Sequence, residues 1–167
     1  MWKRSGLDKN ATIINGAKRK IGIITSKGGH LIQINQLFPI FKQYSHFWVT
    51  FKGKDSEEYL KKEKKYYAYF PESRNIVNAI KNMFLAVKIL LQEKPTVLIS
   101  SGAGIAVPFF CIGKLLKINL VFIETFDYVK YPSLTGKILY NVVDLFLVQH
   151  KIQKKWYPKA KYWGSLL

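Results

Sequence analysis

Four consecutive residues near the start of the chain, Lys27, Gly28, Gly29 and His30, have the composition of an anion-binding turn. Two adjacent glycines allow positive φ angles and let a ligand approach the backbone without a Cβ in the way. A helix that starts at Gly29 or His30 would direct free N–H groups at this turn, which suits a phosphate, and Lys27 adds a positive charge. We therefore predict a phosphate-binding turn. A tight structural turn is the alternative, because neither the dinucleotide pattern GxGxxG nor the P-loop pattern is present.

One histidine and one carboxylate are the candidate acid–base groups. His30 could act as a general base or as a hydrogen-bond partner of a ligand, and Glu124 ends an apolar run farther along the chain. Either group could take a proton from a hydroxyl or orient a sugar. The alternative for Glu124 is a structural carboxylate that neutralises nearby lysines or caps a turn. We predict His30 and Glu124 as the catalytic residues.

Small polar residues are expected beside these two groups. Ser101, Gly102 and Gly104 lie in a second glycine-rich turn, and Ser133 and Thr135 follow Glu124. We predict that they bind the phosphate or the acceptor together with residues 27–29. The three histidines lack ligand spacing and there is one cysteine, so no metal site is supported and no cofactor is implied. The sequence contains no legible Ser/His/Asp set and no GxSxG elbow.

Apolar stretches alternate with helical patterns along the chain, and these elements must position the turns. Strands are expected near residues 20–24, 46–51, 66–70, 95–100, 120–123, 145–148 and 160–163, with helices starting near residues 29, 73, 105, 133 and 151. The charged segment 52–65 is expected to be a solvated, mobile loop. The alternation predicts a doubly wound, Rossmann-like parallel α/β sheet whose ligands bind beyond the carboxyl ends of the strands.

The expected helix from Ser73, a plausible N-cap, to Glu93 carries more apolar surface than one buried face requires. One stripe along it consists of Ile76, Ile80, Met83 or Phe84, Val87 and Leu91. Arg74, Lys81 and Lys88 recur every seventh residue and therefore share one side of the helix. This pattern fits a core helix with a solvated basic edge or a helix that contacts acidic lipid. We predict the three cations as membrane contacts.

The formal net charge of +17 over 167 residues implies an anionic partner, which could be nucleic acid, an acidic membrane surface or a phosphorylated ligand. The length suits one domain, expected at residues 20–167 after a basic flexible tail at residues 1–19. The hydrophobic content of 49% excludes a disordered chain. No run of 18 uncharged apolar residues is present to span a bilayer, and no secretory signal is apparent.

Several segments resemble one known family in their order and spacing. They are SKGGHLIQINQL from Ser26, SSGAGIAVPFFCIGKLLKI from Ser100, FIETF from Phe122 with the later YPSLTGKILY and DLFLVQ, and YPKAKYWG from Tyr157. These segments are similar to the acceptor-side subunit of two-part glycosyltransferases. That group comprises the bacterial PssD/CpsF exopolysaccharide and capsule proteins and their eukaryotic counterpart in dolichol-linked oligosaccharide synthesis. The resemblance covers about residues 20–164.

The resemblance implies the fold of the N-terminal, acceptor half of a GT-B glycosyltransferase, with the donor-binding half on a separate polypeptide. It also implies that the turn at residues 28–30 faces a lipid-diphosphate acceptor, that the turn at residues 101–104 flanks the same cleft, and that Glu124 is the family's carboxylate. The sequence departs from the family pattern at Tyr128, where an arginine is usual, and at His150, where a tryptophan is usual. The membrane segment that some members carry before the first strand is also missing. These departures concern the identity of the acceptor more than the fold.

These observations predict a peripheral protein on the cytoplasmic face of the cell membrane. It would bind a polyprenyl-diphosphate-linked sugar and recruit a separate donor-binding glycosyltransferase subunit, so that a hexose passes from a UDP-sugar during polysaccharide biosynthesis. The chain alone is expected to be inactive. Two alternatives are a basic nucleic-acid-binding α/β protein and a stand-alone small enzyme for a phosphorylated metabolite. Most aromatic residues fall in predicted cores and no RNP pattern occurs, so we expect no nucleic-acid partner.

Overall fold

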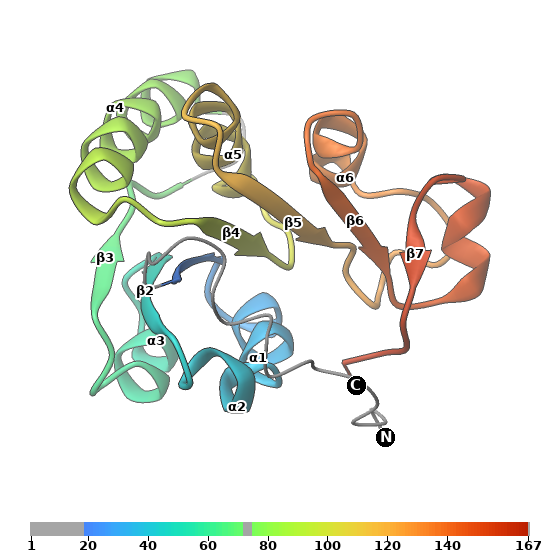
Figure 1. The fold of residues 1–167 in the computed structure, drawn as a ribbon, viewed down its shortest axis with the longest axis horizontal. Helices are drawn as coiled ribbons and strands as arrows, with labels where there is room; N and C mark the ends of the chain where they lie inside the picture. The colour runs from blue at the N-terminus through green and yellow to red at the C-terminus, as the bar shows by residue number, and fades with distance from the viewer. Residues whose placement is uncertain (1–18, 72–74, 167) are drawn as a thin grey trace.

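The computed structural model describes residues 19–71 and 75–166, which form a central sheet covered by helices (Figure 1). The seven strands are parallel, in the order β3-β2-β1-β4-β5-β6-β7. They are β1 (Lys20–Ile24), β2 (Ser45–Thr50), β3 (Lys65–Tyr67), β4 (Val97–Ser100), β5 (Asn119–Ile123), β6 (Leu145–Val148) and β7 (Lys161–Tyr162). The helices are α1 (Gly29–Asn35), α2 (Phe38–Phe41), α3 (Lys54–Tyr59), α4 (Ile76–Glu93), α5 (Ala106–Leu115), α6 (Leu134–Leu139) and the 3-10 helix η2 (Lys151–Lys155). This arrangement confirms the doubly wound α/β fold.

Two apolar cores lie on opposite faces of the sheet, because side chains alternate along each strand. In β2, Phe47 and Val49 join the core beneath α4 and α5, whereas Trp48 joins the core beneath α1 and α2. Figure 1 shows α4, α5 and α6 on one side of the sheet and α1, α2 and α3 on the other. All three β2 side chains are fully buried, as expected for an inner strand of a parallel sheet.

The segment 52–65 is not the solvated loop that its charge predicts. It contains α3, and the Ser56 hydroxyl donates a hydrogen bond to the carbonyl of Phe51 at 2.8 Å. Leu60, which follows α3, is buried in the core beneath α1 and α2. Two buried anchors therefore hold the segment against the sheet, while most of its charged side chains remain in solvent.

Helix α4 starts later than predicted, and the structure decides which of its sides faces the core. Its N-cap is Asn75, whose side chain accepts a hydrogen bond from the Asn78 N–H at 2.9 Å. The predicted cap Ser73 lies outside the described residues. The predicted apolar stripe does share one side of the helix, but that side faces solvent: Ile76 is 78% exposed and Phe84 is 73% exposed. The side against the core instead carries Asn82, Ala86, Ile89, Leu90 and Glu93.

The buried carboxylate at the end of α4 connects the helix to two strands. Glu93 forms ion pairs with Lys20 of β1 and with Lys64 just before β3, and it accepts a hydrogen bond from the hydroxyl of Tyr66. Burial alone would raise the pKa of Glu93, but these donors outweigh it and hold the pKa at about 2. The carboxylate therefore stays ionised in the folded protein at every pH well above 2.

Glu93→Gln is expected to lower the free energy of unfolding by about 3 kcal/mol at pH 7, because the pKa of Glu93 falls on folding. The stabilisation is complete above the unfolded-state value near 4.5 and is lost as the pH falls toward 2. Urea denaturation should accordingly give a difference between the two proteins that is about 2 kcal/mol smaller at pH 3 than at pH 7. Glu57→Gln is the control, because that carboxylate is half exposed and lies 3.8 Å from its lysine partner. A pH-independent difference for Glu93→Gln would contradict the prediction.

Candidate functional site

Three turns meet beyond the carboxyl ends of β1, β4 and β5, where ligands of parallel sheets bind. The turn after β1 leads into α1, the turn after β4 leads into α5, and the segment after β5 leads into α6. A Cβ placed on Gly102 would lie 3.1 Å from the His30 ring and 3.6 Å from the side chain of Thr125. The structure thus brings the predicted groups of all three turns to one rim of the sheet.

His30 and Ser101 join the first two turns by a reciprocal pair of hydrogen bonds. The Nδ1 atom of His30 lies 3.1 Å from the Ser101 carbonyl oxygen, and the Ser101 hydroxyl donates to the His30 carbonyl at 3.0 Å. A carbonyl oxygen can only accept, so Nδ1 must carry the proton. In a neutral imidazole the lone pair is then on Nε2, which is the arrangement that a general base requires.

The backbone around Gly102 has an unusual conformation beside this contact. Gly102 has a φ angle of +114°, and Ala103 has a φ angle of +73°. Glycine tolerates the first value, whereas a positive φ is uncommon for alanine and occurs most often at functional loops. Gly104 is exposed beside them, while Ser101 is fully buried. Ser101 therefore acts through its bonds to His30 rather than through exposed atoms.

The first glycine turn leaves open space around Gly28 and Gly29, but one of its backbone amides already binds a carboxylate of the protein. A Cβ on Gly28 or Gly29 would meet no atom within 4 Å, and Gly28 has a φ angle of +72°. The Gly28 N–H, however, donates to the carboxylate of Asp55 in α3. The ammonium group of Lys27 lies over the ring of Phe70, 4.6 Å from its centre. A phosphate at this turn would therefore meet Lys27 and His30 before the Gly28 amide, which Asp55 occupies.

Glu124 is fully buried, and several groups donate hydrogen bonds to it. Its carboxylate accepts from the Thr125 N–H at 3.0 Å, from the Ser133 hydroxyl at 3.0 Å and from the Tyr157 hydroxyl at 2.5 Å. Burial and the bond to Glu124 both raise the pKa of Tyr157, so the phenol stays protonated and remains a donor. A carboxylate without exposed surface cannot touch an acceptor in this conformation. The geometry favours a positioning role for Glu124 over the acid–base role predicted from the sequence.

Ser133 and Thr135 are also buried, unlike residues that contact a ligand directly. Ser133 is the N-cap of α6: its hydroxyl accepts from the Gly136 N–H at 2.8 Å while donating to Glu124. Gly136 has no room for a side chain, because a Cβ there would clash with the Glu124 carboxylate and the Tyr157 hydroxyl. Glu124, Ser133 and Tyr157 therefore fix the start of α6 at the rim.

Three buried glutamines form a network that the sequence did not indicate. Gln149 donates to the Gln33 side chain at 3.1 Å and to the Glu124 carbonyl at 3.0 Å. Gln153 donates to the Thr125 carbonyl at 2.9 Å and accepts from the backbone N–H groups of residues 149 and 150. The network ties α1, the end of β6 and η2 to the turn after β5. The sequence signals were the polar character of Gln33 within the apolar pattern of α1 and Gln149 at the end of the segment DLFLVQ, and neither indicated a contact, because the partners lie far apart in the chain.

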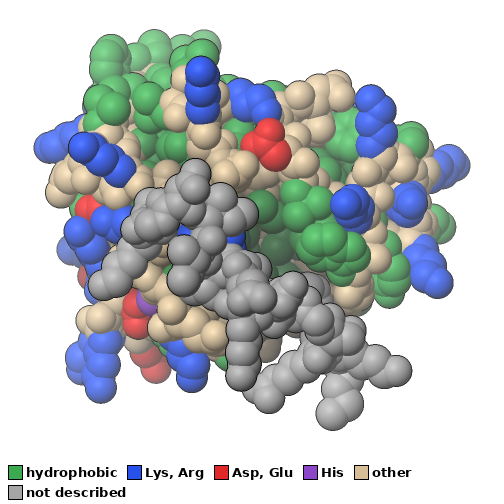
Figure 2. Space-filling view, in the orientation of Figure 1, with side chains coloured by type: hydrophobic (Ala, Val, Ile, Leu, Met, Phe, Trp, Pro, Cys, Tyr) green, Lys and Arg blue, Asp and Glu red, His purple; other side chains and the backbone are tan. Residues whose placement is uncertain are grey.

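Two of the three cations predicted to contact a membrane are described by the structure, and both lie on α4. Lys81 and Lys88 are exposed beside the outward apolar stripe, and the ammonium of Lys81 lies 5.5 Å from the centre of the Tyr69 ring. Arg74 lies outside the described residues. Figure 2 shows apolar side chains with lysines between them along the upper edge, where Figure 1 places α4 and α5. None of the helices in residues 19–71 and 75–166 is long and apolar enough to cross a bilayer.

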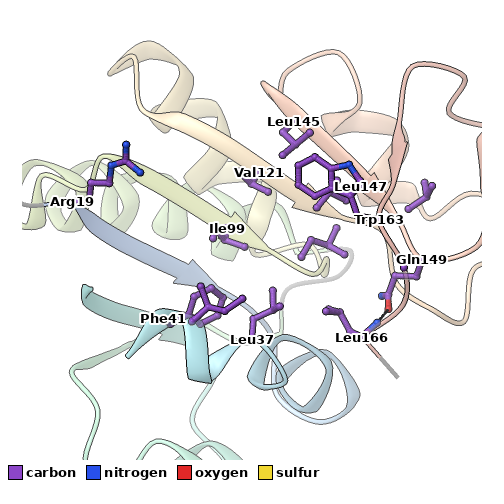
Figure 3. Close-up of a pocket in the computed structure, with 14 residues that line it drawn as sticks. Arg19, Leu37, Phe41, Ile99, Val121, Leu145, Leu147, Gln149, Trp163 and Leu166 are labelled. Atoms are coloured by element: carbon purple, nitrogen blue, oxygen red, sulfur yellow. Dashed lines mark hydrogen bonds between the residues drawn. The ribbon is translucent and has the colours of Figure 1, made fainter. Parts of the chain in front are cut away.

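An apolar cavity of about 450 Å³ opens on the face of the sheet opposite to α4 and α5 (Figure 3). Side chains from β4, β5 and β6, among them Ile99, Val121 and Leu147, face Leu37 and Phe41 across it. Trp163 and Leu166 line the end that follows β7. These strand side chains are only half-buried, although inner strands of a parallel sheet are normally covered on both faces.

A protein-family model and known relatives both match this chain. The family described as "Oligosaccharide biosynthesis protein Alg14 like" matches residues 22–166. The UDP-N-acetylglucosamine transferase subunit ALG14 of Homo sapiens is 30% identical over 119 residues, which cover 62% of this chain and 55% of the human protein. The protein of the same name from Debaryomyces hansenii is 25% identical over 195 residues, covering 99% of this chain and 83% of the relative. The match to the human protein thus spans about half of its length.

Solved structures show the same fold at low sequence identity. The MurG protein of Acinetobacter baumannii has a TM-score of 0.68 at 16% identity, covering 80% of this chain and 42% of the MurG chain. The UDP-N-acetylglucosamine 2-epimerase of Rickettsia bellii has a TM-score of 0.71 at 15% identity, covering 90% of this chain and 46% of the epimerase. Both matches confirm the Rossmann-like fold, of the kind found in GT-B glycosyltransferases, and each spans less than half of the longer chain.

Proposed function

Because this chain belongs to the family of Alg14-like oligosaccharide biosynthesis proteins, we propose that it is the acceptor-side subunit of a two-part, GT-B-type glycosyltransferase. The observation that carries the proposal is the rim where His30, with Nε2 free of the Ser101 contact, lies among the turns after β1, β4 and β5. The acceptor in this proposal is a sugar linked to a polyprenyl diphosphate. The donor is a UDP-sugar, with UDP-GlcNAc the first to test because the curated relatives are named for it.

In the proposed reaction, His30 acts on the acceptor hydroxyl. The hydroxyl oxygen attacks the anomeric carbon of the donor sugar, the bond from that carbon to the UDP oxygen breaks, and UDP leaves with the electron pair. The hydroxyl proton passes to Nε2 of His30, while the Ser101 carbonyl holds the ring through Nδ1. Lys27 provides positive charge for the diphosphate of the acceptor. Glu124 fixes the start of α6 at the rim through its hydrogen bonds.

The helix α4 and its lysines give the proposed contact with the membrane. An apolar stripe that faces water is costly for a soluble protein, whereas the lipid headgroup region accommodates both apolar side chains and flanking lysines. The stripe begins at Ile76, at the end of α4 that follows the carboxyl end of β3, so a membrane-bound α4 would bring this end of the sheet near the headgroups where a lipid-linked diphosphate lies. We place the protein peripherally on the cytoplasmic face, as one domain from residue 20 with a basic tail at residues 1–19.

A donor-binding subunit is the second proposed partner, and the cavity beneath β4, β5 and β6 is its proposed docking region. The curated relatives are named subunits of a transferase, so at least one further chain is expected. Apolar strand side chains that the described residues leave half-exposed are the kind of surface that an obligate partner buries. A role in exopolysaccharide or capsule synthesis, as in the bacterial proteins that the sequence resembles, belongs to the same proposal.

Replacing Ile80 and Phe84 together by aspartate is expected to weaken binding to vesicles by about 100-fold or more. Each large apolar side chain gains about 1.5–3 kcal/mol when fully buried, so even partial insertion of two of them accounts for this factor. The measurement is cosedimentation of the purified chain with vesicles of phosphatidylcholine that contain anionic phosphatidylglycerol as the minor lipid. Lys81→Glu with Lys88→Glu should also weaken binding, by ~1 kcal/mol for each cation removed, and binding should fall as salt rises.

The control for this experiment is Leu115→Asp, an equally exposed leucine at the far end of α5 from the rim. This variant should bind vesicles like the wild type. Unchanged vesicle binding by the folded Ile80/Phe84 variant would show that α4 does not contact the membrane. It would thereby contradict the membrane part of the proposed function.

A further inference from the structure

We propose that the start of α6 is a second membrane contact, on the other side of the rim from α4. The contact consists of Tyr131, Leu134 and Ile138, with Lys130 and Lys137 beside them. The inference rests on the proposed function, in which α4 contacts an anionic bilayer. It adds a second point of attachment, which one helix alone does not provide.

The exposure of these side chains is the first evidence. Tyr131 is 63% exposed, Leu134 is 73% exposed and Ile138 is 45% exposed. Leu134 and Ile138 are four residues apart and therefore share one side of the helix. The opposite side of α6 carries Thr135, Gly136 and Leu139, all buried. A six-residue helix with large apolar groups on its solvent side has unpartnered surface that its own fold does not use.

The position of α6 in the fold is the second evidence. Helices α4, α5 and α6 form one layer on the same face of the sheet, with α5 between the other two (Figure 1). Each of the three begins after the carboxyl end of a strand, so Ile76 in α4 and Leu134 in α6 both lie at the rim end of this layer. The two apolar surfaces therefore flank the proposed acceptor site.

The anchoring of α6 keeps these side chains pointing outward. The N-cap Ser133 is held by the buried Glu124, and Glu124 is also held by Tyr157. Leu134 follows directly after this cap. A rigid support means that the apolar groups cannot fold back into the core when water surrounds them, so insertion into lipid costs little reorganisation.

The chemistry of the segment favours a lipid surface over a protein partner. Residues 127–138 contain two lysines, one aspartate, one exposed tyrosine and two exposed aliphatic side chains. Tyrosine and lysine are common at the level of lipid headgroups, with aliphatic groups below them. Contacts at α4 and α6 together would fix the orientation of the protein on the bilayer and would keep the rim next to the lipid headgroups.

An environment-sensitive dye at position 134 tests the inference directly. In a Cys111→Ser background, Leu134→Cys carries an NBD label, and Phe84→Cys and Leu115→Cys carry the same label for comparison. The vesicles are again phosphatidylcholine with phosphatidylglycerol as the minor, anionic lipid. We expect the emission of labels at positions 84 and 134 to shift to the blue and increase at least two-fold on binding, while the label at position 115 stays unchanged.

A second measurement uses the unlabelled protein. Leu134→Asp with Ile138→Asp should weaken vesicle binding at least ten-fold, whereas Leu115→Asp should not. If the label at position 84 shifts but that at position 134 does not, the α6 contact is wrong while the proposed function stands. If neither label shifts, the membrane part of the proposed function fails as well. Equal shifts at positions 134 and 115 would overturn the inference, because the contact would then not be specific to the rim.

Discussion

Replacing His30 by alanine is expected to lower the turnover of the proposed transferase, assembled with its proposed donor-binding subunit, by about 100-fold or more. A positioned base typically contributes ~10²–10⁴ to the rate, and the bond from Nδ1 to the Ser101 carbonyl leaves Nε2 as the accepting atom. Binding of the donor subunit should be unchanged, because His30 lies at the rim and does not line the apolar cavity. The measurement is turnover at saturating acceptor, compared with the acceptor KM.

Two further variants separate the base from the contact that holds it. His30→Asn retains a side-chain donor that can reach toward Ser101 but has no basic nitrogen, so it should be as slow as His30→Ala. Recovery of most of the activity in His30→Asn would show that the contact between the turns matters and that the base lies elsewhere. If His30→Ala changes only KM, the histidine binds the phosphate side of the acceptor. If it changes neither quantity, the glycine turn is purely structural.

Glu124→Gln tests a different kind of role. The carboxylate accepts hydrogen bonds from three residues at once, and a glutamine amide can accept on its oxygen alone. A positioning residue should affect stability and acceptor KM along with turnover, since the start of α6 depends on it. The pH profile of turnover should keep its shape, because the proposed base is His30.

Local sequence patterns were sufficient to predict the turns of the candidate site that each form within a single β-turn-α unit. The turn at residues 27–30 follows a buried strand and precedes a helix, and the structure starts that helix at Gly29. The second glycine turn was predicted in the same way, from an apolar strand followed by Ser101, Gly102 and Gly104. What could not be predicted was that Ser101 holds the His30 ring, since 71 residues separate them.

Local patterns alone could not settle which surfaces of the chain are buried. The spacing of the stripe on α4 fits either a core face or a lipid-facing surface, and the structure places the core on the other side of the helix, against Ala86 and Leu90. The segment 52–65 is rich in charge, yet one buried serine and one buried leucine hold it to the sheet. Both cases depend on tertiary partners that a pattern of hydrophobicity does not contain.

The second large effect that we expect is that transfer depends on the proposed donor-binding subunit. The purified chain alone should show no transfer above background, and adding the donor-binding subunit should restore it. In the proposed two-part enzyme the donor and the acceptor bind to separate lobes, and the described residues form one parallel α/β sheet with half-exposed apolar side chains on one face. The assay supplies UDP-GlcNAc and a polyprenyl-diphosphate-linked sugar in detergent, with the protein encoded beside this chain as the first candidate subunit.

The docking region can be tested with a matched pair of tryptophans. Trp163 is 51% exposed and lines the apolar cavity, whereas Trp156 is 37% exposed on the turn after η2 and does not line it. Trp163→Ala is expected to weaken binding of the donor subunit at least ten-fold, because buried tryptophans dominate many interfaces, while Trp156→Ala should leave it unchanged. Transfer by Trp163→Ala should recover when the donor subunit is raised to saturation, since the rim around His30 is intact. Equal effects of the two variants would move the interface away from the cavity, and transfer by the chain alone would end the two-part proposal.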